Sequence, residues 1–529
     1  MTAMMRLLLV LLACMPGLAY AADPVAAEPP TKMSPIEVRA NSMEFTRWIK
    51  VGSPNFILYT DAKASEATTI LREFEMLHFA GQVAFNRRAA RFGPIILVLP
   101  TARSDWRKLE TMGADVEWKS AATAPAGQVL DVVLAQYDWQ DEGLSIVRAV
   151  YAALHARRMD VHGPFWFGRG FGMFYQTAEF DRDRVALGRA HPQMWHLQDG
   201  GWLPWGRFFA VNPRSPEFTK ESKIVLYEAQ VAIFTQYLLA HQDRAWMGRL
   251  ATWMEYLEAG GEPTEAKFQE IFGENWKSWQ ATMQTYLRNG SYSIFQVRVP
   301  PDVMKFTEIK YKLPVREIRE LFVLMQTLVQ RTPESKAALE SLLEKGLQSE
   351  ALQELLVDAC LEWDHDDDAL KLMRKLIADG SKNPRVYRMG DALLTRHAGA
   401  FTFATRYGAE IAEVREWDRR GLALEPAFSE LNESLAVNEA GAPVVDQQSI
   451  LTIEECYSRI KGRAPTDRVL AALAMALWRS GDKVTATELA TRLRDDPLCA
   501  KSARKVVEEM LASESKGTLP AGATLLPKS

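Results

Sequence analysis

Hydrophobic and polar positions in the first part of the chain predict strands and helices in turn. Residues 54–61 (PNFILYTD) and 94–101 (PIILVLPT) are short apolar runs bounded by Pro and polar residues, which is typical of buried strands. Residues 64–85 between them carry apolar side chains at helical spacing. The pattern therefore predicts a β-α-β opening, in which ordered structure begins near Phe45.

The same reading continues to about Arg288. It predicts a helix over residues 105–112 and a β-branched strand within residues 127–138. Residues 145–177 read as two short helices joined by a polar turn, and residues 215–241 as one long core helix that starts at a Ser-Pro pair. Three more helical patterns follow.

From about Leu313 the pattern is helical throughout. Residues 469–497 have small side chains at Ala474 and Ala486, Gly481 between two helix-length pieces, and a closing Pro. This segment resembles a tetratricopeptide repeat, whose helix pairs place small residues where two helices cross closely. Residues 355–384 are a weaker copy, with Ala369 in a comparable place. An irregular helical bundle remains the alternative.

Composition and charge narrow the class of protein. A chain of 529 residues with 47% hydrophobic and 25% charged residues is long enough for two or three domains with their own cores. The net charge of −4 argues against nucleic acid as the main partner. Cys360, Cys456 and Cys499 are too few and too far apart for a disulfide framework.

The N-terminus reads as a cleaved secretory signal. It has one Arg, an apolar run, a Pro-Gly break and small residues at Ala19 and Ala21, so we expect an exported, periplasmic protein that begins at Ala22. A lipoprotein anchored through Cys14 is the alternative. No later apolar run approaches the ~20 residues of a membrane-spanning helix.

The middle of the chain is similar to the gluzincin-like "peptidase MA-like" family, in which an exported thermolysin-type domain precedes tetratricopeptide repeats. In that family a helix with HExxH is followed by a helix with PxWLxEGLAEY, whose first Glu is the third zinc ligand. Here the second helix reads PFWFGRGFGMFYQT, and residues 203–218 and 227–239 resemble two further family segments. The resemblance implies an α+β fold: a degenerate gluzincin-like (thermolysin-type) domain followed by an all-α, tetratricopeptide-like helical-repeat domain.

The predicted organisation follows from these patterns and from the resemblance. It comprises a signal peptide (1–21), a flexible linker (22–44), the gluzincin-like domain (45–299), the helical-repeat domain (313–515) and a flexible tail (516–529).

When the family motif is superposed on this chain, the residues that bind and activate zinc are replaced by others. Arg148, Ala149 and Ala152 take the places of the His, Glu and His of HExxH, and Arg169 takes that of the third ligand. Arg has no lone pair to donate and Ala has no donor atom, so we expect no metal, no cofactor and no catalytic residue here. A metallopeptidase with relocated ligands stays open, with His155, His162, His191 and His196 as the histidines to check.

The emptied cleft has a different chemistry. Residues 148–214 contain nine Arg, no Lys and five acids, interleaved with aromatic residues. Arg recognises carboxylates and stacks on aromatic rings, so an anion or a peptide carboxylate is a candidate ligand. Most of these Arg residues are better explained as surface ion pairs or as cover for hydrophobic surface. The candidate cleft residues are Arg148, Trp166, Arg169, Tyr175 and Glu228.

Glu228 is the first candidate for the counter-charge of these arginines. It lies where the family usually carries Tyr, and two guanidinium groups in a partly buried cleft need a carboxylate. We therefore predict a carboxylate hydrogen bond to Arg148 or Arg169. The resulting function hypothesis is a periplasmic scaffold module that binds an envelope protein or peptide through the cleft and the helical repeats. A zinc metallopeptidase and a lipid-anchored envelope assembly factor are the alternatives.

Overall fold

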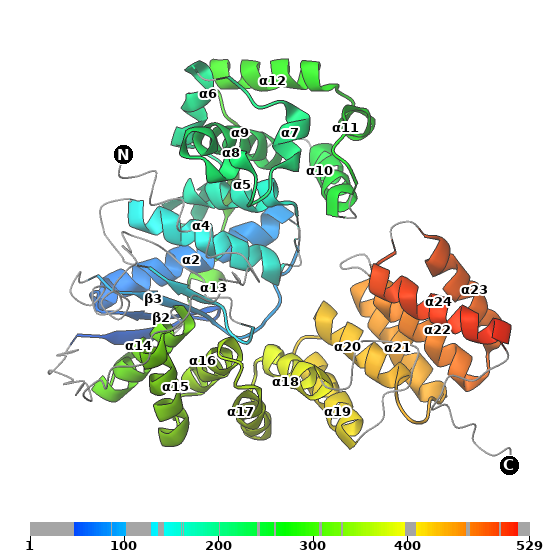
Figure 1. Ribbon diagram of the computed structural model, residues 1–529. Helices are drawn as coiled ribbons and strands as arrows, with labels where there is room; N and C mark the ends of the chain where they lie inside the picture. The colour runs from blue at the N-terminus through cyan, green and yellow to red at the C-terminus, as the bar shows by residue number, and fades with distance from the viewer. Residues whose placement is uncertain are drawn as a thin grey trace, which may run out of the picture.

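The computed structural model describes most of the chain after Arg47 (Figure 1). The described residues are 47–85, 87–101, 128–135, 142–159, 161, 163–199, 201–240, 244–258, 261–305, 309–329, 332–396, 409–461, 466–496 and 499–516. The predicted signal peptide and linker, Cys14, the predicted helix over 105–112, His162 and nearly all of the predicted tail lie outside them.

A five-stranded mixed sheet organises the first half of the chain. It consists of β1 (Ile49–Gly52), β2 (Phe56–Thr60), β3 (Ile95–Leu99), β4 (Val132–Leu134) and β8 (Ile309–Lys312), in the order β4-β3-β2-β1-β8. β2, β3 and β4 run parallel, whereas β1 is antiparallel to both of its neighbours. The predicted β-α-β opening is confirmed by β2, α2 (Ala64–Phe85) and β3. β8 was not predicted from the sequence.

Helices cover both faces of this sheet, and its side chains alternate between two cores. Leu58, Leu97 and Val133 pack toward α2, α4 (Glu142–Arg158) and α5 (Phe165–Gln176); we call this side the α4 face. Ile96 and Val98 pack toward later helices, and we call that side the α16 face. It is covered by α14 (Val315–Val329), α16 (Glu350–Glu362), α17 (Asp366–Ala378) and α18 (Pro384–Arg396).

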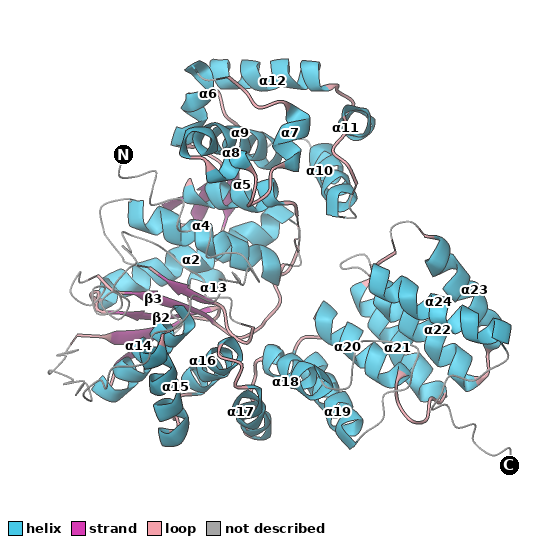
Figure 2. Ribbon diagram, viewed as in Figure 1, coloured by secondary structure: helices cyan, strands magenta, loops and turns pink. Residues whose placement is uncertain are grey.

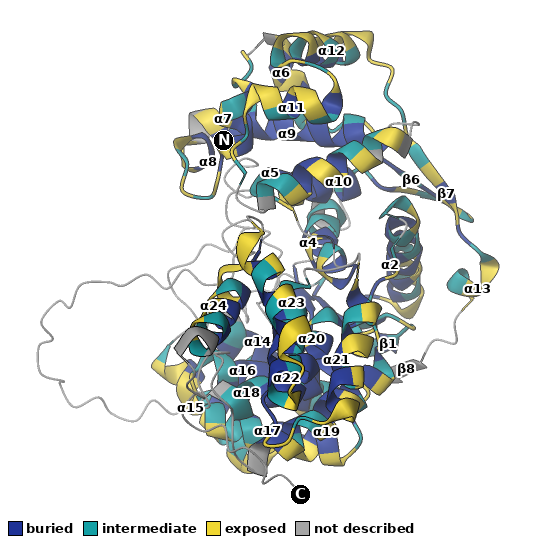
Figure 3. Ribbon diagram, turned by 90° about the vertical axis from the view of Figure 1, so that its right-hand side faces the viewer, coloured by how far each residue is buried: buried dark blue, intermediate teal, exposed yellow. Residues whose placement is uncertain are grey.

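A mainly helical subdomain extends the α4 face. The long predicted core helix is α9 (Glu221–Ala240), which is buried along most of its length, as is α2 (dark blue in Figure 3). A three-stranded sheet, in the order β5-β6-β7, lies beside it. The remaining elements are β5 (Glu179–Asp181), β6 (Arg184–Leu187), a 3-10 turn (Pro192–Trp195), α6 (His196–Asp199), α7 (Trp205–Ala210), α8 (Pro216–Thr219), α10 (Arg244–Glu258), α11 (Glu265–Phe272), α12 (Trp276–Asn289), β7 (Phe295–Arg298) and α13 (Pro301–Met304).

All the described helices and strands after residue 313 are helices, as predicted (Figure 2). Ala474 and Ala486 are fully buried where α22 and α23 meet, and Gly481 ends α22 with a φ of 104°, a left-handed conformation that suits Gly. The chain is thus mostly helical with small sheets, an α+β fold. The helices not yet named are α15 (Pro333–Lys345), α19 (Ala409–Leu424), α20 (Ser429–Ala440), α21 (Gln447–Ile460), α22 (Asp467–Ser480), α23 (Lys483–Asp495) and α24 (Lys501–Lys516).

The helical region is joined to the sheet by buried polar contacts as well as by apolar packing. The carboxylate of Asp358 on α16 accepts backbone N–H bonds from Gln128, Val129 and Leu130 at 2.7, 2.9 and 2.9 Å. Asn383, just before α18, donates its side-chain N–H to the Val129 carbonyl at 3.0 Å. The core of the α16 face therefore contains residues from both sides of the predicted boundary at 299–313.

None of the described helices is long and apolar enough to cross a membrane.

Candidate functional site

α5 places glycines at its contacts with the two neighbouring helices. A Cβ atom on Gly172 would meet the Ala149 carbonyl oxygen at 3.5 Å, so α4 and α5 lie against each other there. A Cβ on Gly170 would clash with the Thr235 side chain of α9. α5 is therefore held between α4 and α9, and Arg169 faces α8 and α9 rather than α4.

Arg148 points toward α2 and β5. Its Nη2 donates to the carboxylate of Glu73 at 3.1 Å, and its Nη1 donates to the Ala178 carbonyl at 3.0 Å. The guanidinium group also lies 4.9 Å from the centre of the Phe180 ring. Three kinds of contact therefore fix Arg148, whose side chain is only 15% exposed.

Arg169 has the partner that the sequence predicted. It forms an ion pair with Glu228 on α9, and their side chains are 8% and 2% exposed. Gln193 donates its side-chain N–H to the other carboxylate oxygen of Glu228 at 2.9 Å. Phe218 places its ring 5.6 Å from the Arg169 guanidinium. A buried charge pair thus lies at the position that the family motif assigns to the third zinc ligand.

The two arginines have separate counter-charges. Arg148 is bound to α2 through Glu73, whereas Arg169 is bound to α9 through Glu228. The two guanidinium groups therefore do not share a carboxylate, because α4 and α5 direct them toward different helices.

Trp166 and Tyr175 do not line an open cleft. Trp166 is fully buried, with its ring 5.0 Å from that of Phe234 and 5.8 Å from that of Phe209. Tyr175 is fully buried and hydrogen-bonds through its hydroxyl to Nδ1 of His155 at 2.9 Å. The expectation that both contact a ligand is corrected, since the apolar faces of α5 place them in the core. Ala152 is also fully buried.

A pair of stacked histidines lies between α2 and α4, and it was not predicted from the sequence. His78 on α2 and His155 on α4 stack with ring centres 4.4 Å apart, and Nδ1 of His78 is 2.8 Å from the hydroxyl of Tyr151. Burial, with the charge of Arg158, lowers the pKa of His78 to about 3. Burial also lowers the pKa of His155 well below its usual range. Both rings are therefore neutral near pH 7.

The other candidate histidines are held apart from this pair. His191 contacts the side-chain oxygen of Gln176 through Nε2 at 2.9 Å, and burial followed by the charge of Arg169 lowers its pKa to about 4. His196 is exposed at the start of α6. Within the described ranges, no group of three His, Cys, Asp or Glu side chains is placed to hold a metal ion. The donor set at the motif positions does not fit zinc.

A second buried charge cluster joins the two faces of the sheet. Asp131, just before β4, accepts from Nε of Arg158 at 2.6 Å and from Nη1 of Arg385 at 2.8 Å, and it also pairs with Arg157. Burial alone would raise the pKa of Asp131, but Arg385, Arg158 and Arg157 together hold it well below its usual range. We call these four residues the Asp131 cluster. Arg157 and Arg158 come from α4, whereas Arg385 comes from α18.

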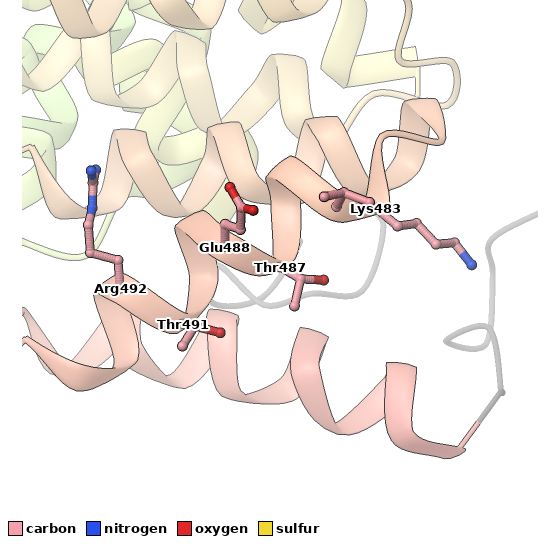
Figure 4. A pocket seen from close by; sticks show the side chains of 6 residues that line it. Lys483, Thr487, Glu488, Thr491 and Arg492 are labelled. Carbon is pink, nitrogen blue, oxygen red and sulfur yellow. The ribbon is translucent and has the colours of Figure 1, made fainter.

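The helical region presents an exposed face on α23 (Figure 4). A shallow hollow of about 660 Å³ follows this helix, and Val484 within it is 73% exposed. Lys483, Glu488 and Arg492 give the same face both signs of charge. A single exposed valine among charged residues is ordinary for a protein surface.

Comparison with known proteins gives no match to a family model, to a curated protein or to a solved structure.

Proposed function

We propose that the chain is an exported, periplasmic, non-catalytic relative of the gluzincins that binds peptides or envelope proteins. The observation that carries this proposal is the buried Arg169–Glu228 pair at the third-ligand position. A zinc ion there would face a guanidinium group, and Ala149 offers no base to take a proton from a bound water.

Two surfaces support a binding role. β4 ends the described five-stranded sheet at one edge, and an extended peptide can add to such an edge through main-chain hydrogen bonds. The helical hairpins after residue 313 resemble repeat proteins, which bind partners along their extended surfaces. The exposed face of α23 belongs to this region.

The test uses the mature chain, residues 22–529, equilibrated with zinc and then freed of unbound metal. Metal content, hydrolysis of a quenched fluorescent casein and binding of dye-labelled denatured casein are measured together. We expect less than stoichiometric zinc, no hydrolysis above the buffer rate and saturable binding. Stoichiometric zinc together with hydrolysis would show that the chain is a metallopeptidase. Absence of casein binding would contradict the proposed binding role.

A control variant tests the superposition of the motif itself. It combines Arg148→His, Ala149→Glu, Ala152→His and Arg169→Glu with Glu228→Tyr, because a new carboxylate at 169 would repel Glu228. If the superposition is correct, this variant gains zinc that the parent lacks. A folded variant without zinc would show that the motif lies elsewhere.

A further inference from the structure

A hollow of about 580 Å³ lies between the loop after α6 and helix α12, outside the candidate site. One wall is formed by Trp202, Leu203 and Pro204. The other is formed by Gln280 and Gln284, which are four residues apart and therefore share one side of α12. Like the hollow on α23, it is shallow and open to solvent.

The loop that carries Trp202 is hydrogen-bonded to α9. Gln230 on α9 is fully buried, and its amide both accepts from the Leu203 N–H at 2.9 Å and donates to the Leu203 carbonyl at 3.1 Å. The ring of Trp202 contacts that of the buried Trp205, with ring centres 6.1 Å apart. A wall fixed in this way needs little ordering when a ligand binds, which favours affinity.

Among the described lining residues none is ionisable, and three are amides. Gln198, Gln280 and Gln284 supply the polar groups, and Nε2 of Gln280 is buried without a hydrogen-bond partner in the described structure. These residues offer no cation to a phosphate or carboxylate ligand and no carboxylate to a metal ion. A purely apolar ligand would leave the amides unpaired, which is unfavourable.

We propose that this hollow binds a neutral carbohydrate of one or two sugar rings. Sugar hydroxyls both donate and accept hydrogen bonds, as glutamine amides do, and the C–H face of a pyranose packs on the indole of Trp202. The proposal does not rest on the state of the candidate site, because none of the lining residues belongs to it.

Gly201 offers a way to block the hollow without disturbing the fold. A Cβ atom on Gly201 meets nothing within 4 Å, and the residue does not have the left-handed backbone that only glycine tolerates. Gly248 on α10 is equally open and exposed, and lies outside the hollow. Gly201→Tyr is therefore the blocking variant and Gly248→Tyr its matched control.

The experiment titrates the mature chain with cellobiose and with the disaccharide of N-acetylglucosamine, and follows tryptophan fluorescence and calorimetry. We expect saturable binding of at least one disaccharide, lost in Gly201→Tyr, weakened at least about tenfold in Trp202→Ala and unchanged in Gly248→Tyr. Circular dichroism checks that each variant is folded. No binding of either sugar by the parent chain up to about 10 mM would overturn the proposal. So would equal binding by the blocked variant, or binding of a proline-rich peptide in place of the sugars.

Discussion

The two faces of the five-stranded sheet bury different titratable groups. The α4 face buries His78 and His155, and burial lowers the pKa of both. It also buries Glu75 on α2, and burial raises the pKa of this acid. The α16 face buries two acids of α16. Burial, followed by the nearby Glu350, raises the pKa of Glu354 to about 8, and burial raises that of Asp358 to about 6 despite its three backbone N–H bonds.

The two histidines and Glu354 respond to pH in opposite directions. The histidines are neutral in the folded chain, so their contribution is complete above pH 6.5 and is lost as the pH falls toward the folded pKa. Glu354 is protonated in the folded chain, so its contribution is complete below pH 4.5 and is lost as the pH rises toward 8. Acid therefore weakens the packing around the histidines, and mild alkali weakens the packing around Glu354.

The Asp131 cluster connects the faces, and breaking it should have the largest effect. Asp131→Asn would leave the guanidinium groups of Arg158 and Arg385, which are 1% and 7% exposed, without their shared charge. We expect a loss of about 3 to 5 kcal/mol in the free energy of unfolding, measured in urea. Asp183→Asn, whose partner Arg298 is 79% exposed, should leave the unfolding midpoint unchanged. Equal effects of the two variants would contradict the connecting role.

The pH response of the α16 face can be isolated at Glu354. A glutamine at position 354 has no proton to lose between pH 5 and 8. The free energy of unfolding of Glu354→Gln should therefore fall less over this range than that of the parent chain. The difference should be on the order of 3 kcal/mol, since each unit of pKa corresponds to about 1.4 kcal/mol.

Glu340→Gln on the exposed side of α15 is the matched control and should keep the pH profile of the parent chain. A Glu354→Gln variant with the same pH profile as the parent chain would show that Glu354 is ionised in the folded state.

The packing on the α4 face can be tested at Gly81. A Cβ there would clash with the hydroxyl of Tyr175 and lie 2.6 Å from the His155 ring, so Gly81→Ala should destabilise by about 1 to 3 kcal/mol. Tyr175→Phe removes the clashing oxygen and should recover part of this loss in the double variant. Gly172→Ala has room for its methyl group and gains helix propensity, so it should be neutral or stabilising. Thermal unfolding of the four variants measures these differences.

The sequence predicted the helices and strands better than the contacts between them. The short apolar runs predicted β2 and β3, and the apolar residues at helical spacing predicted α2, α5 and α9. β8 was missed because its four residues, IKYK, alternate with charge and are a strand only through pairing with β1. The helices after residue 313 showed an apolar face, but periodicity does not state that this face packs on the sheet.

The residues of the candidate site were also predicted only in part. Glu228 was predicted from the resemblance, which placed it where the family usually carries Tyr, together with the need of the buried arginines for a counter-charge. The Asp131 cluster was not predicted, because Asp131 and Arg385 are 254 residues apart and meet only when α18 packs on the sheet. The stacked histidines were missed because His78 and His155 come from different helices and no resemblance brought them together.

The smallest effect is expected where the Arg169–Glu228 pair is replaced as a unit. Glu228→Gln alone leaves a buried, unbalanced guanidinium group and should cost about 3 kcal/mol or more. Arg169→Met combined with Glu228→Leu removes both charges, and the double variant should lie within about 1 kcal/mol of the parent chain in urea unfolding. Loss of Arg169 also removes one of the two causes that lower the pKa of His191, so this pKa should rise above its value of about 4 when followed by NMR. The double variant could instead be as unstable as Glu228→Gln and leave the pKa of His191 unchanged. The Arg169–Glu228 pair would then belong to a wider charge network, and it would not differ in kind from the Asp131 cluster.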